Sequence, residues 1–174
     1  SKHPANAAKQ IYDIFRPVAD FDEQEAAWLI DGWLPAGQIA LIASDGGVGK
    51  TTVDCEIAAA ISSGTTCILD REGTQRKPGH VLFLTTEDSI SKKLRKKLRK
   101  LGANLDNIFA PDPSLDVNGE LRNLKFGSPA LSGIIRKLKP ALCILDPMQG
   151  YVPADINMGS RNAMRDCLAP LAAL

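Results

Sequence analysis

The chain has 174 residues and a formal net charge of +1, with 44% hydrophobic and 24% charged residues. This length and balance predict one globular domain and exclude the strong basic excess of proteins that coat nucleic acid. The four cysteines are scattered without a C-x-x-C pair, which favours buried thiols in a reducing compartment over a zinc site or disulfides. No apolar run approaches the roughly 18 residues of a membrane span, so we expect a cytoplasmic protein with no membrane partner.

The first elements predicted along the chain are a linker and a strand–loop–helix unit. Residues 11–25 are mixed and weakly helical, and we assign residues 1–27 to an N-terminal segment or linker that precedes a core at 28–174. The apolar run QIALIA at 38–43 predicts a fully buried strand. A glycine-rich loop follows, and then apolar residues at helical spacing, with Gly64 where a helix C-cap belongs.

The rest of the core alternates strands with helices. Buried strands are predicted for HVLFLTTED and ALCILDP, and IFA is a candidate edge strand. Amphipathic helices are expected over 90–101 and near 128–139, and another helix begins near residue 165. This alternation predicts an α/β fold with a mostly parallel sheet and helices on both faces.

Residues 44–52, SDGGVGKTT, have the form of the phosphate-binding loop G-x-x-x-x-G-K-[ST] between a strand and a helix. In such a loop the backbone N–H groups and the helix N-terminus point at the β-phosphate, and the glycines let the backbone approach it closely. Lys50 would reach the β- and γ-oxygens, and the Thr51 hydroxyl would ligate Mg²⁺. The predicted nucleotide-binding residues are Ser44, Asp45, Gly46, Gly47, Val48, Gly49, Lys50, Thr51 and Thr52.

One position departs from the motif, because Ser44 replaces its first glycine. That position lies at the strand exit, where a small residue fits if its φ stays negative, so we expect the loop to work. The alternative interpretation is a glycine-rich turn that binds nothing.

Two carboxylates complete the predicted site. Asp146 ends the strand ALCILD and has the form of the acid that holds Mg²⁺ through water, although a strand-end cap is the alternative. Pro147 follows it, so the general base must come from elsewhere. Glu87 ends the strand VLFLTTE, and neighbouring parallel strands deliver their last residues to the same sheet edge. The alternative role for Glu87 is that of a helix N-cap, but Asp88 or Ser89 suits that role better than Glu87 does. We therefore predict Glu87 as the base.

The order of WLIDGWLPAGQIALIASDGGVGKTT, VLFLTTEDS with the basic KKLRKKLRKLGA, and ALCILDPMQGYV resembles the RecA-like AAA ATPases related to the RepA replicative helicase. The resemblance covers the chain from about Trp28 onward. It implies a RecA-like P-loop NTPase core and ATP hydrolysis with Mg²⁺ by a homo-oligomer, a ring-forming hexamer, that moves along single-stranded DNA. It also implies a plasmid, phage or integrated element as the source. Matched by position, it implies that Lys50 and Thr51 bind phosphate and Mg²⁺, Asp146 holds the metal's water, and Glu87 polarises the attacking water.

The chain departs from the family pattern at its end as well as at Ser44. It stops before the family's next strand, which carries the γ-phosphate sensor and leads to the arginine finger and a DNA-facing loop. In the RecA-like sheet that strand lies between ALCILD and QIALIA, so the implied spatial order is IFA, VLFLTTE, ALCILD, the further strand and QIALIA. We therefore expect that the natural polypeptide continues past Leu174 and that the C-terminal part of the core is missing here.

Two segments are candidates for DNA contact, and each has a plainer alternative. The basic run at 92–100 could track phosphates or be a solvated helix face that covers a leucine stripe. The loop at 150–162 could stack Tyr151 on a base and place Arg161 on phosphate, or simply connect two elements. The functional alternative to a helicase is a nucleotide-dependent regulatory or helicase-loading module without translocation. A small-molecule kinase is disfavoured, because no arginine-rich lid segment follows the nucleotide motifs.

Overall fold

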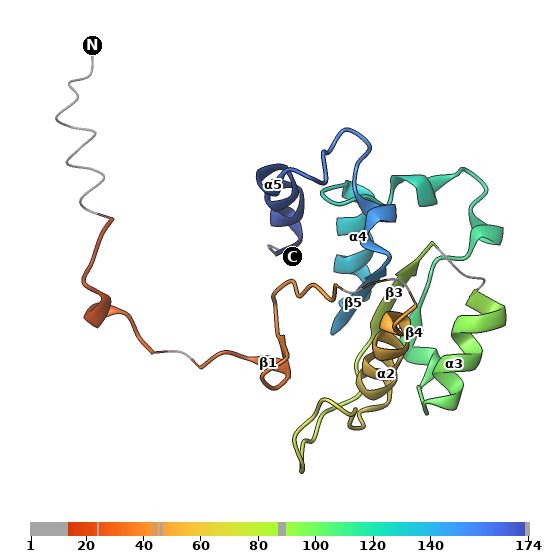
Figure 1. Cartoon of the computed structure of the whole chain (residues 1–174), viewed down its shortest axis with the longest axis horizontal. Helices are drawn as coiled ribbons and strands as arrows, with labels where there is room; N and C mark the ends of the chain where they lie inside the picture. Colours follow the sequence, from red (N-terminus) through yellow and green to blue (C-terminus); the bar gives the residue numbers. More distant parts are fainter. Residues whose placement is uncertain (1–13, 24, 44, 46, 87–89, 173–174) are drawn as a thin grey trace.

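The computed structural model describes residues 14–172 except 24, 44, 46 and 87–89. A parallel sheet forms the centre of the described chain (Figure 1). Its strands, in spatial order, are β4 (Ile108–Phe109), β3 (Val81–Thr85) and β5 (Leu142–Asp146). Strands β3 and β5 pair without a break from Val81–Leu142 to Thr85–Asp146, so their carboxyl ends lie level. The predicted order of these three strands is therefore confirmed.

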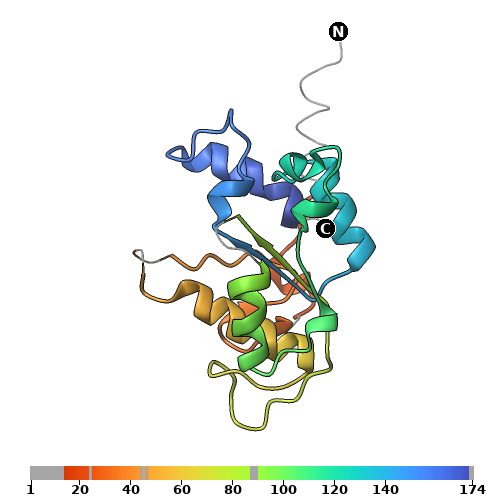
Figure 2. The same cartoon turned by 90° about the vertical axis from the view of Figure 1, so that its right-hand side faces the viewer.

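Helices cover both faces of the sheet, as predicted. The α-helices are α2 (Lys50–Ser63), α3 (Arg95–Lys100), α4 (Pro129–Leu138) and α5 (Arg161–Ala172). Because side chains alternate along a strand, Val81 and Phe83 pack with α2 and α3, whereas Leu82 and Leu84 pack with α4 and α5. Figure 2 shows α4 and α5 above the sheet and α2 and α3 below it. The fold is that of an α/β P-loop NTPase.

Local signals located several element ends correctly. Helix α2 ends at Gly64, whose φ of 72° lies in the left-handed region that glycine adopts without strain. The Ser128 side chain accepts a hydrogen bond from the backbone N–H of Leu131 at 3.1 Å and caps α4. The helix predicted over 90–101 forms as a π-helical segment, η2 (Ile90–Leu94), followed by α3. The 3₁₀ turns are η1 (Val18–Asp20), η3 (Leu105–Asn107), η4 (Pro113–Leu115), η5 (Glu120–Asn123) and η6 (Met148–Tyr151).

The buried strand predicted at 38–43 is wrong. These residues run as irregular chain, and Ile39 and Leu41 are 46% and 71% exposed. A strand is stabilised when its backbone N–H and C=O groups pair with a neighbouring strand, and among the described residues β5 pairs only with β3. An apolar run without such a partner does not become a strand.

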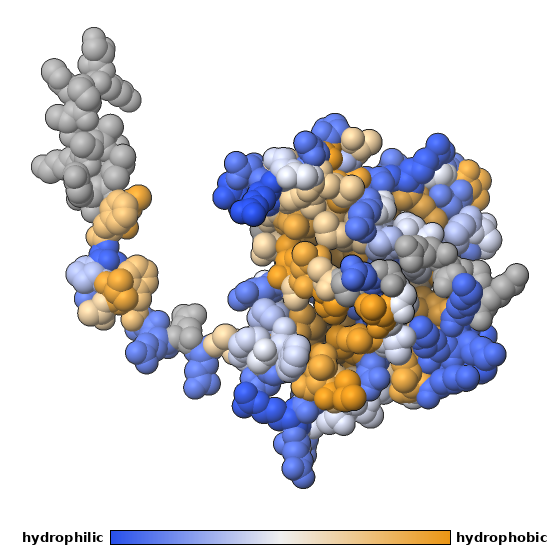
Figure 3. All heavy atoms as spheres, in the orientation of Figure 1, coloured by the Kyte–Doolittle hydropathy of each residue, from blue (hydrophilic) through white to orange (hydrophobic). Residues whose placement is uncertain are grey.

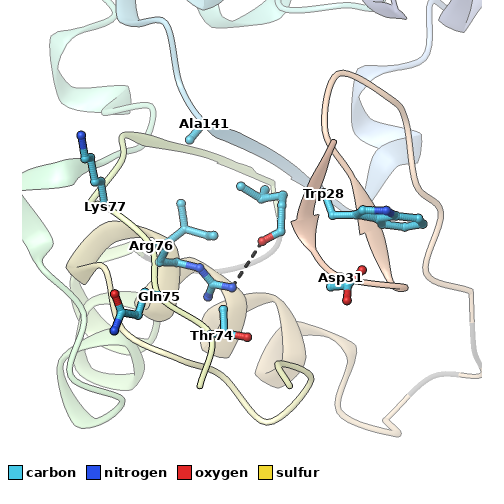
Figure 4. A pocket seen from close by; sticks show the side chains of 9 residues that line it. Trp28, Asp31, Thr74, Gln75, Arg76, Lys77 and Ala141 are labelled. Atoms are coloured by element: carbon cyan, nitrogen blue, oxygen red, sulfur yellow. Dashed lines mark hydrogen bonds between the residues drawn. The ribbon is translucent and has the colours of Figure 1, made fainter. Parts of the chain in front are cut away.

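A hairpin and an ion pair lie at the amino ends of the sheet strands. Strands β1 (Trp28–Ile30) and β2 (Leu34–Pro35) pair antiparallel, and the exposed segment before them extends away from the body (Figure 1). The Arg76 guanidinium donates to both carboxylate oxygens of Asp70 and to the Leu29 carbonyl oxygen of the hairpin. Figure 4 shows this contact beside a cavity of about 200 Å³. Arg76 thus ties the hairpin to the 65–80 loop.

None of the helices in the described part of the chain is long and apolar enough to cross a membrane.

Candidate nucleotide site

The glycine loop leads directly into α2. Gly47 and Gly49 have φ values of 82° and 96°, a conformation that glycine adopts readily and L side chains rarely do. Gly49 is the N-cap of α2, and its carbonyl oxygen accepts from the N–H groups of Thr52 and Val53. The earlier N–H groups of a helix have no intrahelical partner and form a natural site for a phosphate. Of the predicted loop residues, Ser44 and Gly46 lie outside the described residues.

The side chain of the motif's lysine, Lys50, reaches back to the backbone of the loop. Lys50 Nζ donates a hydrogen bond to the Asp45 carbonyl oxygen at 3.0 Å. The loop residues Gly47, Val48 and Gly49 are exposed on the surface. The ammonium group is therefore held beside a loop that a phosphate can approach from solvent.

Thr51 and Asp146 meet although 95 residues separate them in the sequence. The Thr51 hydroxyl donates to Asp146 Oδ2 at 2.6 Å, which joins the start of α2 to the carboxyl end of β5. Mg²⁺ prefers oxygen ligands and usually keeps several waters, binding through one or two protein groups plus phosphate oxygens. A hydroxyl and a carboxylate in contact fit that requirement. The described residues contain no cluster of three or more His, Cys, Asp or Glu that could form an all-protein metal cage.

The predicted general base cannot be placed. Glu87 lies outside the described residues. Strand β3 ends at Thr85, which pairs in register with Asp146. The chain therefore leaves β3 at the sheet edge where Thr51 and Asp146 meet, two residues before Glu87.

Asp54 is a charged neighbour of the site that the sequence interpretation missed. It follows Lys50 by one helical turn and Thr51 by three residues, so the three share one side of α2. Burial raises the pKa of Asp54 from 3.8 to about 6, the negative charge of Asp146 adds to this effect, and Lys50 opposes it. The helical spacing from Thr51 was a signal that could have identified this residue.

A cavity of about 430 Å³ opens beside the Thr51–Asp146 contact. Its inner wall includes these two residues and Phe83 and Thr85 of β3. Its outer wall is formed by lysines of the basic run at 92–100, called the basic segment below. One of them, Lys97, donates from Nζ to Thr52 Oγ1 at 3.2 Å. The basic segment does cover a leucine stripe, because Leu94 and Leu98 are buried. Its lysines nevertheless line a cavity rather than facing only solvent.

The predicted stacking role of Tyr151 does not fit this structure. Tyr151 is 4% exposed and packs in the apolar cluster with Leu82 and Leu84. Burial raises the pKa of its phenol to about 12, and the charge of Asp146 contributes. Because the Tyr151 ring is buried in the core, neither face of the ring is open to a nucleic-acid base. Arg161 begins α5 and is exposed.

Comparison with known proteins agrees with this geometry. A family model described as "AAA domain" matches residues 15–174. The chain is also similar to the DNA repair protein RadA of Bacillus subtilis (strain 168), with 26% identity over 145 residues. That match covers 82% of this chain and 26% of the relative, so the chain spans about a quarter of the length of RadA.

Together, the fold, the glycine loop and the Thr51–Asp146 contact define a nucleotide-binding P-loop ATPase. The chain belongs to the AAA domain family.

Proposed function

We propose that the chain is the Mg²⁺-dependent ATPase motor domain of a RepA-like DNA helicase, with residues 28–174 as its core and 1–27 as a linker. The observation that carries the ATPase part is the 2.6 Å contact between Thr51 and Asp146 at the start of the helix after the glycine loop. It joins the motif's hydroxyl to a strand-end carboxylate, as Mg²⁺–nucleotide binding requires. Membership of the AAA domain family supports the same activity.

In this proposal the residues of the chain orient ATP and move one proton. The loop N–H groups and Lys50 would hold the β- and γ-phosphates, and Thr51 and Asp146 would hold Mg²⁺. When bound, Mg²⁺ supplies positive charge that offsets the charge developing on the phosphate oxygens. Glu87 accepts a proton from the attacking water, whose oxygen bonds to the γ-phosphorus as the bond to the ADP oxygen breaks.

The helicase part of the proposal, with single-stranded DNA as partner and a hexamer as the working form, rests on the resemblance. The exposed Arg161, within the segment 150–162 and at the start of α5, supports a phosphate contact. The burial of Tyr151 favours the second candidate, a regulatory or helicase-loading module that binds nucleotide without moving along DNA. The two candidates differ in whether single-stranded DNA stimulates hydrolysis.

The test is the ATPase rate with and without single-stranded DNA, in the parent and in Lys50→Ala. We expect Lys50→Ala to lose at least about 10²-fold in rate, because it removes a preorganised cation from the transferring phosphoryl group. Lys137→Ala, at an exposed site on α4, is the matched control and should keep the parent rate. A parent-like rate in Lys50→Ala would refute the loop assignment. DNA-independent hydrolysis would favour the regulatory module.

A further inference from the structure

Four lysines of the basic segment lie on one side of it. Lys93, Lys96, Lys97 and Lys100 recur at the spacing that places residues on one helix face. All four line the cavity of about 430 Å³, whereas Arg95 and Arg99 of the same helix do not. Lysines of this segment therefore line the cavity, whereas its arginines lie outside the lining. In Figure 3 the surface over α3 is strongly hydrophilic.

The cavity carries an excess of positive charge. Among the residues that the structure describes, its wall contains four lysines and one aspartate, Asp146. Asp54 is a further carboxylate near Asp146, and with a pKa of about 6 it is mostly ionised at neutral pH, so it reduces this excess without removing it. Like charges at i and i+4 on a helix repel each other, so an anion between them would be stabilising.

Two contacts hold the lysine face toward the cavity. Leu94 and Leu98 are buried against α2 and the sheet, which sets the rotation of the helix. Lys97 is hydrogen-bonded to Thr52, directly after the predicted Mg²⁺ ligand Thr51. Lys96 and Lys100 are exposed at the outer wall, one turn apart. The cavity thus runs from the Thr51–Asp146 contact outward to these two ammonium groups.

We propose that this cavity is a product subsite that binds inorganic phosphate after it separates from ADP, with Lys96 and Lys100 as its outer ligands. The inference rests on the proposed ATPase function. A phosphate leaving the γ-position beside Thr51 and Asp146 has this cavity next to it, and a tetrahedral dianion fits well within a volume of about 430 Å³. Lysine ammonium groups are suited to phosphate as mobile point charges with three donors each.

A direct titration tests the subsite without any turnover. Inorganic phosphate is titrated by calorimetry into Lys50→Ala, in which the glycine loop has lost its cation. Adding Lys96→Gln and Lys100→Gln should weaken phosphate binding by roughly tenfold or more, because two charged donors are lost. The matched control adds Arg95→Gln and Arg99→Gln, which remove the same charge from the same helix outside the cavity. It should change the affinity by no more than about twofold, since these two side chains do not line the cavity and solvent screens their charge from an anion inside it. Far-UV circular dichroism checks that each variant is folded.

Product inhibition tests the role during hydrolysis. In the chain with Lys50 intact, the double substitution Lys96→Gln and Lys100→Gln should raise the inhibition constant for phosphate by roughly tenfold. It should leave the KM for ATP nearly unchanged. Equal effects of the lysine and arginine pairs, absence of phosphate binding in Lys50→Ala, or an effect on oligonucleotide binding alone would each overturn the subsite. If the parent does not hydrolyse ATP, the proposed function fails, while the direct titration still decides whether the cavity binds phosphate.

Discussion

Both ends of the sheet carry acidic and basic side chains, but these are buried as an ion pair at the amino ends and line an open cavity at the carboxyl ends. At the amino ends Arg76 and Asp70 are 11% and 2% exposed, and they are paired through both carboxylate oxygens. At the carboxyl ends Asp146 meets a neutral hydroxyl, and lysines line the cavity in excess. A buried pair matched within the chain holds the fold together, whereas a group of lysines along an open cavity is suited to a charged ligand. The comparison predicts that substitutions at the amino ends will change the free energy of unfolding, whereas those at the carboxyl ends will mainly change ATP turnover.

The largest effect on activity is expected from Glu87→Gln, two residues after the carboxyl end of β3 in the sequence. It should lower turnover by about 10²–10⁴-fold while keeping ATP and Mg²⁺ binding, because it removes the base and preserves the shape. Steady-state ATPase rates and binding of a fluorescent ATP analogue measure the two properties. Glu72→Gln, at an exposed site in the 65–80 loop, is the control. Undiminished hydrolysis in Glu87→Gln would transfer the role of base to another residue.

At the amino end, Asp70→Asn should lower stability without changing the turnover of the folded protein. Burial would raise the pKa of Asp70, but hydrogen bonds from Arg76 and from the Cys67 N–H outweigh it and lower the pKa. The pair therefore stabilises the fold above the ordinary aspartate pKa, and this contribution is lost as pH falls through the lowered value. Leaving Arg76 buried and unpaired should cost about 3 kcal/mol in urea unfolding at neutral pH.

The control for that prediction is the exposed ion pair between Arg71 and Asp31, at 2.9 Å. Asp31→Asn should change the free energy of unfolding by less than about 1 kcal/mol, because solvent screens exposed pairs. If Asp70→Asn unfolds as the parent does, Arg76 is not the structural tie that its hydrogen bonds indicate.

Asp54→Asn should stabilise the nucleotide-free and metal-free protein more as pH rises. The pKa of Asp54 is about 6 in the fold and 3.8 as a model value, so the folded chain holds the proton more tightly. Stability from this group is present below pH 4 and lost as pH rises through 6. Full burial would make this about 3 kcal/mol, and we expect about 1–2 kcal/mol because solvent reaches the half-buried group.

Urea unfolding of parent and Asp54→Asn at pH 4 and pH 8 measures this difference. Asp166→Asn, at an exposed site on α5, controls for the loss of one negative charge. A gain in stability that is the same at both pH values would show that packing, and not ionisation, is responsible.

The smallest effect is expected at Ser44. Ser44→Gly should change nucleotide affinity by less than about 1 kcal/mol, because a small residue with negative φ fits at a strand exit. Titration with an ATP analogue measures it. Much tighter binding in the glycine variant would indicate that serine weakens the loop.

The sequence was a good guide where local backbone requirements decide the structure. Gly47 and Gly49 permit the loop, Gly64 ends α2, and Ser128 begins α4, because each acts through its own neighbouring residues. The continuous burial of β3 was equally predictable from its apolar run, since both faces of a central strand are covered. The run at 38–43 was apolar in the same way but formed no strand, because pairing depends on a neighbour that no local pattern specifies.

By itself, the sequence determined the glycine loop before α2 and the acid at the end of β5, since short-range spacing encodes these features. The order of the central strands was implied by the family resemblance, and the structure has the same order. Only the tertiary structure decided that Thr51 contacts Asp146, that Asp54 stands beside them, and that Tyr151 is buried. It also decided which cations of the basic segment line a cavity. Contacts of this kind join residues far apart in the chain, and their geometry follows from how α2, α3 and η6 pack on the sheet.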